Sequence, residues 1–135
     1  MADRRNADPK KAEKEKEWEV EYADEFEGWW NGLTEAEQED IAAVVGVLRE
    51  KGRPSLRRPY VGPIVISKHP NMKELIIQHK GKPYRVLFAF DPRRTAILLI
   101  GGDKTGNKLW YEQLVPVADG LYDEHLKELK KEGLI

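Results

Sequence analysis

The sequence predicts an α+β domain: an antiparallel β-sheet of four to five strands, an N-terminal helix pair and a C-terminal helix. Apolar segments with strand-like alternation follow one another between residues 60 and 101, and only short turns that contain Gly or Pro separate them. Apolar residues at helical spacing precede these segments in residues 34–48 and follow them in residues 116–131. A chain of 135 residues with this order of elements suits one compact domain.

The first strand is predicted where Trp18, Val20 and Tyr22 alternate with glutamates, the period typical of a half-buried strand. An aromatic cluster at residues 26–30 indicates a short helix after this strand. The Asn-Gly pair at residues 31–32 ends that helix.

A second helix begins at Thr34, which forms an S/T-x-x-E capping box with Glu37. Its apolar positions fall at i, i+3, i+4 and i+7 and share one stripe: Ile41, Val44, Val45 and Leu48. Gly52 and Pro54 end the helix. We expect the two helices to form an antiparallel hairpin that packs this stripe on the sheet.

Four further strands are predicted near residues 60–67, 72–79, 83–90 and 95–101. Pro63 lacks an N–H and indicates an edge position or a bulge in the first of them. The short segments 80–82 and 91–94 predict hairpin-like connections. The last helix is predicted from Pro116 to Lys131, with Gly133 just beyond it.

Residues 1–17 are polar, mix charges of both signs and lack a core-forming face. They predict a disordered tail or a solvated helix in front of a single domain over residues 18–135. The chain has no Cys, which excludes disulfides and thiolate metal sites, and we predict no metal ion and no cofactor. No apolar run approaches the roughly 20 residues of a membrane span, and there is no signal-peptide core. We therefore expect a cytoplasmic protein without a membrane partner.

The net charge of −1 hides a strong segregation along the chain. Residues 18–50 carry 1 basic and 10 acidic side chains, whereas residues 51–110 carry 13 basic and 3 acidic side chains. The predicted strands and turns at residues 72–104 hold seven of these cations: Lys73, Lys80, Lys82, Arg85, Arg93, Arg94 and Lys104. A cationic sheet favours binding of a polyanion such as RNA, although solvated faces of opposite sign would give the same pattern.

Strand alternation sorts residues 83–90 into two faces: Tyr84, Val86, Phe88 and Phe90 on one, and Arg85, Leu87 and Ala89 on the other. We expect the aromatic face to meet the helices and Arg85 to lie on the open face, near Ile76. Burying an unpaired Arg is costly, so Arg85 needs an anion nearby. A phosphate ligand and a structural ion pair with Glu74 both remain open.

A long segment, MKELIIQHKGKPYRVLFAFDPRRTAILLIGGDKTGNKLWYE, resembles the HigB-like branch of the RelE/ParE superfamily of bacterial toxins. The flanking pieces WEVEYADEFEGWWNGLTEAEQEDI and VPVADGLYDEHLKEL are similar to it too, so the resemblance covers residues 18–132. It implies a RelE-like α+β fold and metal-independent endonuclease action on mRNA in the ribosomal A site. It also implies three partners: a cognate antitoxin protein, the ribosome and mRNA.

In the implied reaction a ribose 2′-OH attacks the adjacent phosphate, which requires a proton acceptor, cations over the phosphorane and a proton donor for the leaving oxygen. Matched by motif, Arg85 of PYRV is the phosphate-stabilising Arg, and Lys104 of GGDK is a second cation. Tyr111 of WYE lies in the region of the catalytic Tyr. Three further side chains are candidates for the general base or acid: Lys68, His69 and Lys73. Further RNA phosphate contacts are expected from Lys68, Lys80, Lys82, Arg93 and Arg94, and His125 is expected to be structural.

The chain departs from this branch at Ile76, which stands where the branch has an Arg after KEL. Together with Ile64 and Ile66 it makes one edge of the sheet apolar, which predicts a groove for a protein or peptide partner. Three functions therefore remain open: an mRNA endonuclease, a natural or engineered scaffold that has lost its chemistry and binds an apolar partner, and a gyrase poison of the ParE kind. The basic positions favour the first.

Overall fold

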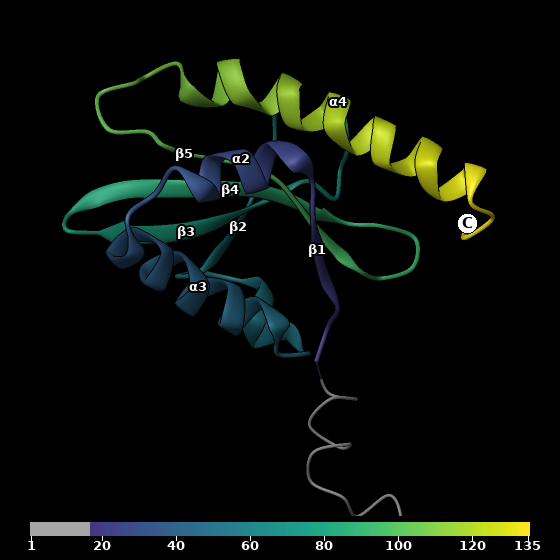
Figure 1. The fold of residues 1–135 in the computed structure, drawn as a ribbon, viewed down its shortest axis with the longest axis horizontal. Coiled ribbons are helices and arrows are strands. Elements are labelled where there is room, and N and C mark those ends of the chain that lie inside the picture. The colour runs from purple at the N-terminus through teal and green to yellow at the C-terminus, as the bar shows by residue number, and fades with distance from the viewer. Residues whose placement is uncertain (1–16) are drawn as a thin grey trace, which may run out of the picture.

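A computed structural model describes residues 17–135 of the chain. It shows a five-stranded mixed sheet with helices on both faces (Figure 1). Its elements are β1 (Val20–Tyr22), α2 (Asp24–Asn31), α3 (Glu35–Arg49), the 3-10 helix η2 (Arg53–Leu56), β2 (Val61–Pro63), β3 (Lys73–His79), β4 (Lys82–Phe90), β5 (Ala96–Asp103) and α4 (Trp110–Lys131). This arrangement confirms the predicted fold class. The predicted polar tail lies outside the described residues except for Glu17, which forms an isolated bridge with Glu50.

The strand order is β1-β5-β4-β3-β2, and the four strands from β2 to β5 are antiparallel, as predicted. β1 instead runs parallel to β5, with Val20 opposite Ala96. The direction of β1 is not set by a hairpin, because three strands and both N-terminal helices separate it from β5 along the chain. A parallel edge strand of this kind cannot be read from local periodicity.

The turn between β3 and β4 has the geometry of a tight hairpin. Lys80 and Gly81 have φ angles of 49° and 80°, the two positive values that a type I′ turn requires. The hairpin predicted at residues 80–82 is therefore confirmed. It fixes the register in which Ile76 lies opposite Arg85, also as expected.

Two predicted boundaries are wrong. The strand expected at residues 60–67 is only three residues long, because the chain bends away after Pro63 and Ile64. The last helix starts at Trp110 rather than at Pro116, and the proline lies inside it. The start was predicted at Pro116 because proline is common at the first position of a helix. The side chain of Asn107 accepts a hydrogen bond from the N–H of Leu109 at 3.0 Å just before the true start.

The two faces of the sheet carry separate cores. Helices α2 and α3 pack on one face, and the core between them and the sheet contains Phe26, Ile41, Leu48, Leu75, Ile77, Val86 and Phe88. Helix α4 packs on the other face, in a core that contains Met72, Leu87, Ala89, Leu99, Val115, Ala118 and Tyr122. The aromatic face of β4 meets the N-terminal helices as predicted, but the face of Arg85 is not open, because α4 packs over its neighbour Leu87 (Figure 1).

Two adjacent glycines let one helix on each side approach β5. A Cβ on Gly101 would lie 2.3 Å from the ring of Trp29 on α2. A Cβ on Gly102 would lie 2.8 Å from Nε1 of Trp110, the first residue of α4. Neither position has room for a side chain, so these glycines set the distance of both helices from the sheet.

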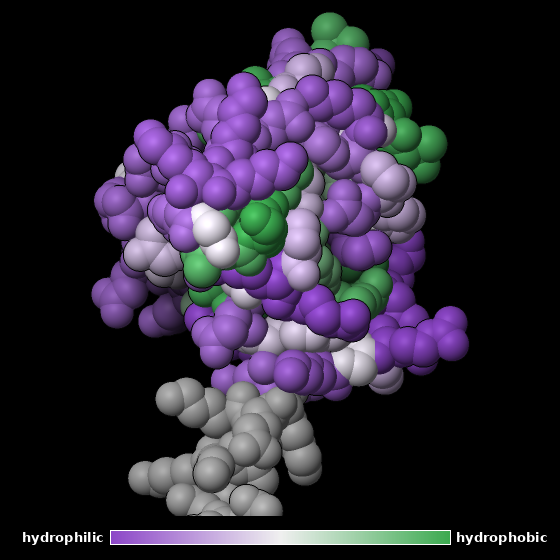
Figure 2. All heavy atoms as spheres, turned by 90° about the vertical axis from the view of Figure 1, so that its right-hand side faces the viewer, coloured by the Kyte–Doolittle hydropathy of each residue, from purple (hydrophilic) through white to green (hydrophobic). Residues whose placement is uncertain are grey.

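The end of the molecule that carries the C-terminus of α4 and the turn between β4 and β5 is mostly hydrophilic, and its apolar side chains form small separate clusters (Figure 2). Among the described residues, no helix is both long enough and apolar enough to cross a membrane.

Candidate active site

The candidate site brings together side chains from four segments on the α4 side of the sheet. Arg85 comes from β4 and Glu74 from the neighbouring strand β3. Tyr111 lies in the first turn of α4, and Lys104 directly follows β5. Three of these residues were predicted from sequence as one site, and the structure places Arg85, Lys104 and Tyr111 together.

Arg85 and Glu74 form a buried ion pair. Nε of Arg85 lies 3.2 Å from Oε1 of Glu74, and the two side chains are only 13% and 8% exposed. Nη1 of Arg85 donates to the carbonyl oxygen of Tyr84 at 2.9 Å. The Nε–H does not point at the carboxylate, and it is the one buried side-chain N or O atom within residues 17–135 that makes no hydrogen bond. The guanidinium is thus charge-compensated but retains a free donor.

Tyr111 joins the ion pair, and the three side chains Arg85, Glu74 and Tyr111 form one unit. Its hydroxyl donates to Oε1 of Glu74 at 2.7 Å, the same oxygen that faces Arg85. Burial raises the pKa of Tyr111, and the bond to Glu74 raises it further, while the nearby Arg85 opposes the shift. The phenol therefore stays protonated at neutral pH and acts as a donor. Nζ of Lys104 lies 5.7 Å from the centre of its ring, within the range of a cation–π contact.

A groove of about 380 Å³ opens beside this unit. Its walls are formed by the residues Pro63, Ile64, Val65, Ile66, Glu74, Tyr111 and Glu112. Val65 is 89% and Ile66 58% exposed, whereas Ile64 is buried in the core under α4. Of the three isoleucines predicted to form an apolar groove, Ile64 and Ile66 line this one and Ile76 does not.

Lys68 and His69 lie elsewhere, against the middle of α4. Lys68 pairs with Asp123, and Nε2 of His69 lies 2.8 Å from the same carboxylate. Asp123 comes twelve positions after Tyr111 on the helix, which is roughly 18 Å along the axis. The structure therefore separates these two candidates for acid–base chemistry from Arg85.

The other predicted cations are dispersed. Lys73 pairs in register with Phe88, which places it on the α3 face, opposite to Arg85. Arg93 and Arg94 follow the far end of β4, about 27 Å along the strand from the turn that carries Lys80 and Lys82. The sheet therefore does not form one continuous cationic platform.

Arg93 is also neutralised, by Asp91 and Glu21 at 2.7 and 2.8 Å. His125 approaches the same Asp91 at 2.9 Å. Burial would raise the pKa of Asp91, but the hydrogen bonds from Arg93 and His125 hold it below its ordinary value. This network ties the turn after β4 to α4, in line with the structural role predicted for His125.

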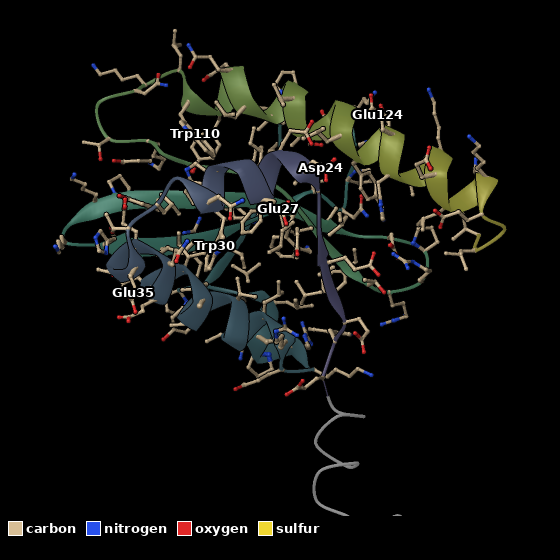
Figure 3. The ribbon with its side chains drawn as sticks, viewed as in Figure 1. Asp24, Glu27, Trp30, Glu35, Trp110 and Glu124 are labelled. Carbon is tan, nitrogen blue, oxygen red and sulfur yellow. The ribbon has the colours of Figure 1, made fainter. Side chains whose placement is uncertain are left out.

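Sequence reasoning treated Glu74 only as a structural partner and gave no role to Trp110. Two signals pointed to them. Gly62 on β2 pairs with Glu74 on β3. Glycine inside a strand often marks a close approach of other groups. The glycine pair after Ile100 likewise marks the place where Trp110 packs against the sheet (Figure 3).

A second groove, of about 450 Å³, lies between α2, α3 and β1. Its apolar floor and walls come mainly from Val20, Tyr22, Phe26, Trp30, Val45 and Leu98. Glu27 and Trp30 project from α2 into the space between the two helices (Figure 3). The sequence predicted the acidic charge of this half of the molecule but not the groove.

Clusters of three or more His, Asp or Glu side chains able to hold a metal ion do not occur among residues 17–135.

Residues 28–123 match the model of the family described as phage-derived protein Gp49-like. Two toxin-family proteins of Mycobacterium tuberculosis (strain ATCC 25618 / H37Rv) are similar to the chain. HigB2 is 41% identical over 104 residues, which cover 76% of this chain and 51% of HigB2. HigB3 is 43% identical over 96 residues, which cover 70% of this chain and 82% of HigB3. The chain thus spans about half the length of the first relative and most of the second.

One solved structure with a related outline is the crystal structure of the intact E. coli RelBE toxin–antitoxin complex. The TM-score is 0.43 and the sequence identity 13%, over 63% of this chain and 94% of the matched chain.

Proposed function

The chain belongs to the Gp49-like family, and we propose that it is a HigB-type toxin of a toxin–antitoxin module that cleaves mRNA on the ribosome. The observation that carries this proposal is the convergence of Arg85, Lys104 and Tyr111 around Glu74 in a partly buried site that opens to a groove. Cleavage on ribosomes would place the protein in the cytoplasm.

In the proposed reaction, the 2′-oxygen of a ribose bonds to the adjacent phosphorus while the bond from phosphorus to the 5′-oxygen breaks. The products are a 2′,3′-cyclic phosphate and a 5′-OH. Arg85 and Lys104 stabilise the charge of the phosphorane, since cations preorganised in a partly buried site act more strongly than in water. The reaction needs no metal ion.

Two proton transfers accompany these bond changes. Tyr111, protonated at neutral pH, gives a proton to the leaving 5′-oxygen. The carboxylate of Glu74 accepts the proton of the 2′-OH, and the proton returns to Tyr111 after cleavage. Lys68, His69 and Lys73 have no part in this scheme, because His69 and Lys68 pair with Asp123 and Lys73 lies on the other face.

The test is induced expression in bacteria, with growth measurement and primer extension on a reporter mRNA, for the natural chain and its Arg85→Ala variant. The proposal expects growth arrest and new mRNA 5′ ends that disappear in the variant. Normal growth and intact mRNA with well-folded protein would reject it. Inhibition of DNA supercoiling by the purified protein would instead support a gyrase poison.

We further propose that a cognate antitoxin docks in the groove between α2, α3 and β1. Tyr22 is 57% exposed and Trp30 and Val45 are half-buried, so apolar surface is available there. The surrounding residues 18–50 carry 10 acidic side chains and 1 basic one. The matching occupant is an antitoxin segment that combines apolar anchors with Lys and Arg.

This docking proposal has a clear test. Val45→Glu places a charge on the apolar wall and should weaken antitoxin binding at least tenfold in calorimetric titration, while mRNA cleavage remains. Ile66→Glu serves as the matched control, because it changes the groove beside Glu74 instead. If Ile66→Glu weakens antitoxin binding and Val45→Glu does not, the antitoxin docks in the groove beside Glu74. The antitoxin would then be the partner of the apolar groove predicted from the sequence.

A further inference from the structure

Arg58 lies beside the candidate active site, although it precedes β2 and belongs to none of the motifs of that site. The segment that carries it is held against β3, because the N–H of Ile76 donates to the carbonyl oxygen of Tyr60 at 2.8 Å. This bond continues the pairing between β2 and β3 and fixes the chain two residues after Arg58.

The guanidinium of Arg58 approaches the same point above Gly62 as the side chains of Glu74 and Ile76. A Cβ on Gly62 would lie 3.3 Å from Oε2 of Glu74, 3.5 Å from Cδ1 of Ile76 and 3.6 Å from Nη2 of Arg58. The three groups thus surround one point on the sheet. Paired residues share a face of a sheet, so this point lies on the face of Glu74 and Arg85.

Arg58 differs from most other cations near α4 in having no carboxylate partner. Lys68 and Arg93 each pair with a carboxylate within 4 Å. Arg58 is exposed, and no ion pair of Arg58 occurs among residues 17–135. Its exposed guanidinium is therefore available to a ligand.

The strand order relates Gly62, the position beside Arg58, to the strand that carries Arg85. Ile76 is the register partner of Arg85, and Gly62 lies one strand further out on β2. The backbones of β2 and β4 are therefore roughly 10 Å apart. This separation is compatible with contacts from Arg58 and Arg85 to neighbouring phosphates of one RNA strand.

We propose that Arg58 binds the RNA phosphate next to the one that is cleaved. This inference rests on the proposed function and adds a substrate contact to it. Arg58 takes no part in proton transfer. It positions the strand across β2 and β3 so that the scissile phosphate reaches Arg85. The contact is a charge-assisted hydrogen bond, and it releases one counterion from the RNA.

The test measures binding of a short single-stranded RNA by fluorescence anisotropy at several KCl concentrations. The RNA carries 2′-O-methyl groups, which prevent cleavage. Arg58→Gln should weaken binding about tenfold at low salt and reduce the slope of log Kd against log salt by about 0.7. Arg57→Gln is the matched control, since Arg57 is the exposed neighbour and is absent from the junction at Gly62, and it should retain the slope of the natural chain.

Arg58→Lys keeps the charge and should restore most of the slope. Thermal unfolding should show no change for these variants, because the replaced side chains are exposed. If Arg58→Gln keeps the natural slope while Arg85→Gln lowers it, the inference is wrong and the proposed function stands. An absence of RNA binding by the natural chain also overturns the inference. The cellular assay with Arg85→Ala decides the proposed function separately.

Discussion

Oε1 of Glu74 lies 3.2 Å from Nε of Arg85 and also accepts the hydroxyl of Tyr111 at 2.7 Å. One carboxylate oxygen therefore serves both a cation from a strand and a phenol from a helix. The three side chains form one electrostatic unit, and the effects of their substitutions should be strongly non-additive.

Arg85→Ala should lower mRNA cleavage at least tenfold, on the order of 1.4 kcal/mol of activation free energy. It should also lower the free energy of unfolding by about 3 kcal/mol, because it leaves the buried carboxylate of Glu74 without its cation. Urea unfolding and a cleavage assay on programmed ribosomes measure the two effects. The double variant Arg85→Ala/Glu74→Ala should recover stability but not cleavage. Because Glu74 is the proposed proton acceptor, recovery of cleavage in this double variant would reject a catalytic role for both Arg85 and Glu74.

Ile76→Arg should raise RNA affinity by different amounts in two backgrounds. In the natural chain the new guanidinium meets that of Arg58 near Gly62, so like-charge repulsion should limit any gain in RNA binding to about twofold. In the Arg58→Gln background the same substitution supplies the missing cation and should restore most of the lost affinity. RNA-binding isotherms of the four chains measure this difference. Equal gains in both backgrounds would show that the two positions do not interact.

Gly102→Ala should displace Trp110 and with it the first turn of α4, because a Cβ would lie 2.8 Å from Nε1 of the indole. We expect a loss of about 1–3 kcal/mol in the free energy of unfolding and a loss of cleavage as Tyr111 moves. Gly120→Ala is the control within the same helix. It has no neighbour within 4 Å and should raise stability by up to about 1 kcal/mol.

Stability at acidic pH should depend on the pair Tyr84 and Glu37. The hydrogen bond from Tyr84, together with those from the backbone and side chain of Thr34, lowers the pKa of Glu37 from 4.5 to about 2. A carboxyl group with a lowered pKa in the folded state stabilises above its unfolded pKa, so its contribution is lost as the pH falls from 4.5 through 2. Tyr84→Phe should flatten the fall of the free energy of unfolding across this range. An unchanged pH profile, measured by urea unfolding, would contradict the assignment.

The same bond acts in the opposite direction at alkaline pH. It raises the pKa of Tyr84 from 10.0 to about 12, together with burial and the charges of Glu37 and Asp103. A raised folded pKa means that the contribution is complete below pH 10 and is lost as the pH rises through 12. The ultraviolet absorbance of tyrosinate at these pH values provides an independent measurement.

His69→Gln should leave mRNA cleavage within about twofold of the natural chain, because this ring pairs with Asp123 roughly 18 Å along α4 from Tyr111. Cleavage as a function of pH should accordingly show no dependence on this histidine. Asp123→Asn changes the partner of His69 and should likewise leave mRNA cleavage unchanged. A tenfold loss of cleavage in His69→Gln would return this residue to the reaction centre.

The sequence by itself determined the type and order of the elements and the faces of the central strands. The capping box at Thr34, the helical stripe that ends at Leu48 and the alternation in β4 are local patterns, and local patterns fix which side of an element is apolar. The expected site residues Arg85, Lys104 and Tyr111 came from the family resemblance. Their proximity follows from strand register and from the start of α4.

Only the tertiary structure decided what surrounds Arg85. Pairing of β1 with β5, the docking of α4 over the second face and the junction of Arg58 and Glu74 over Gly62 all join residues far apart in the sequence. Such contacts depend on packing and register, which no periodicity encodes. For the same reason, the cationic surface predicted from the sequence is larger than the one in the structure. A carboxylate of β1 pairs with Arg93 and one of α4 pairs with Lys68, and only folding brings these groups together.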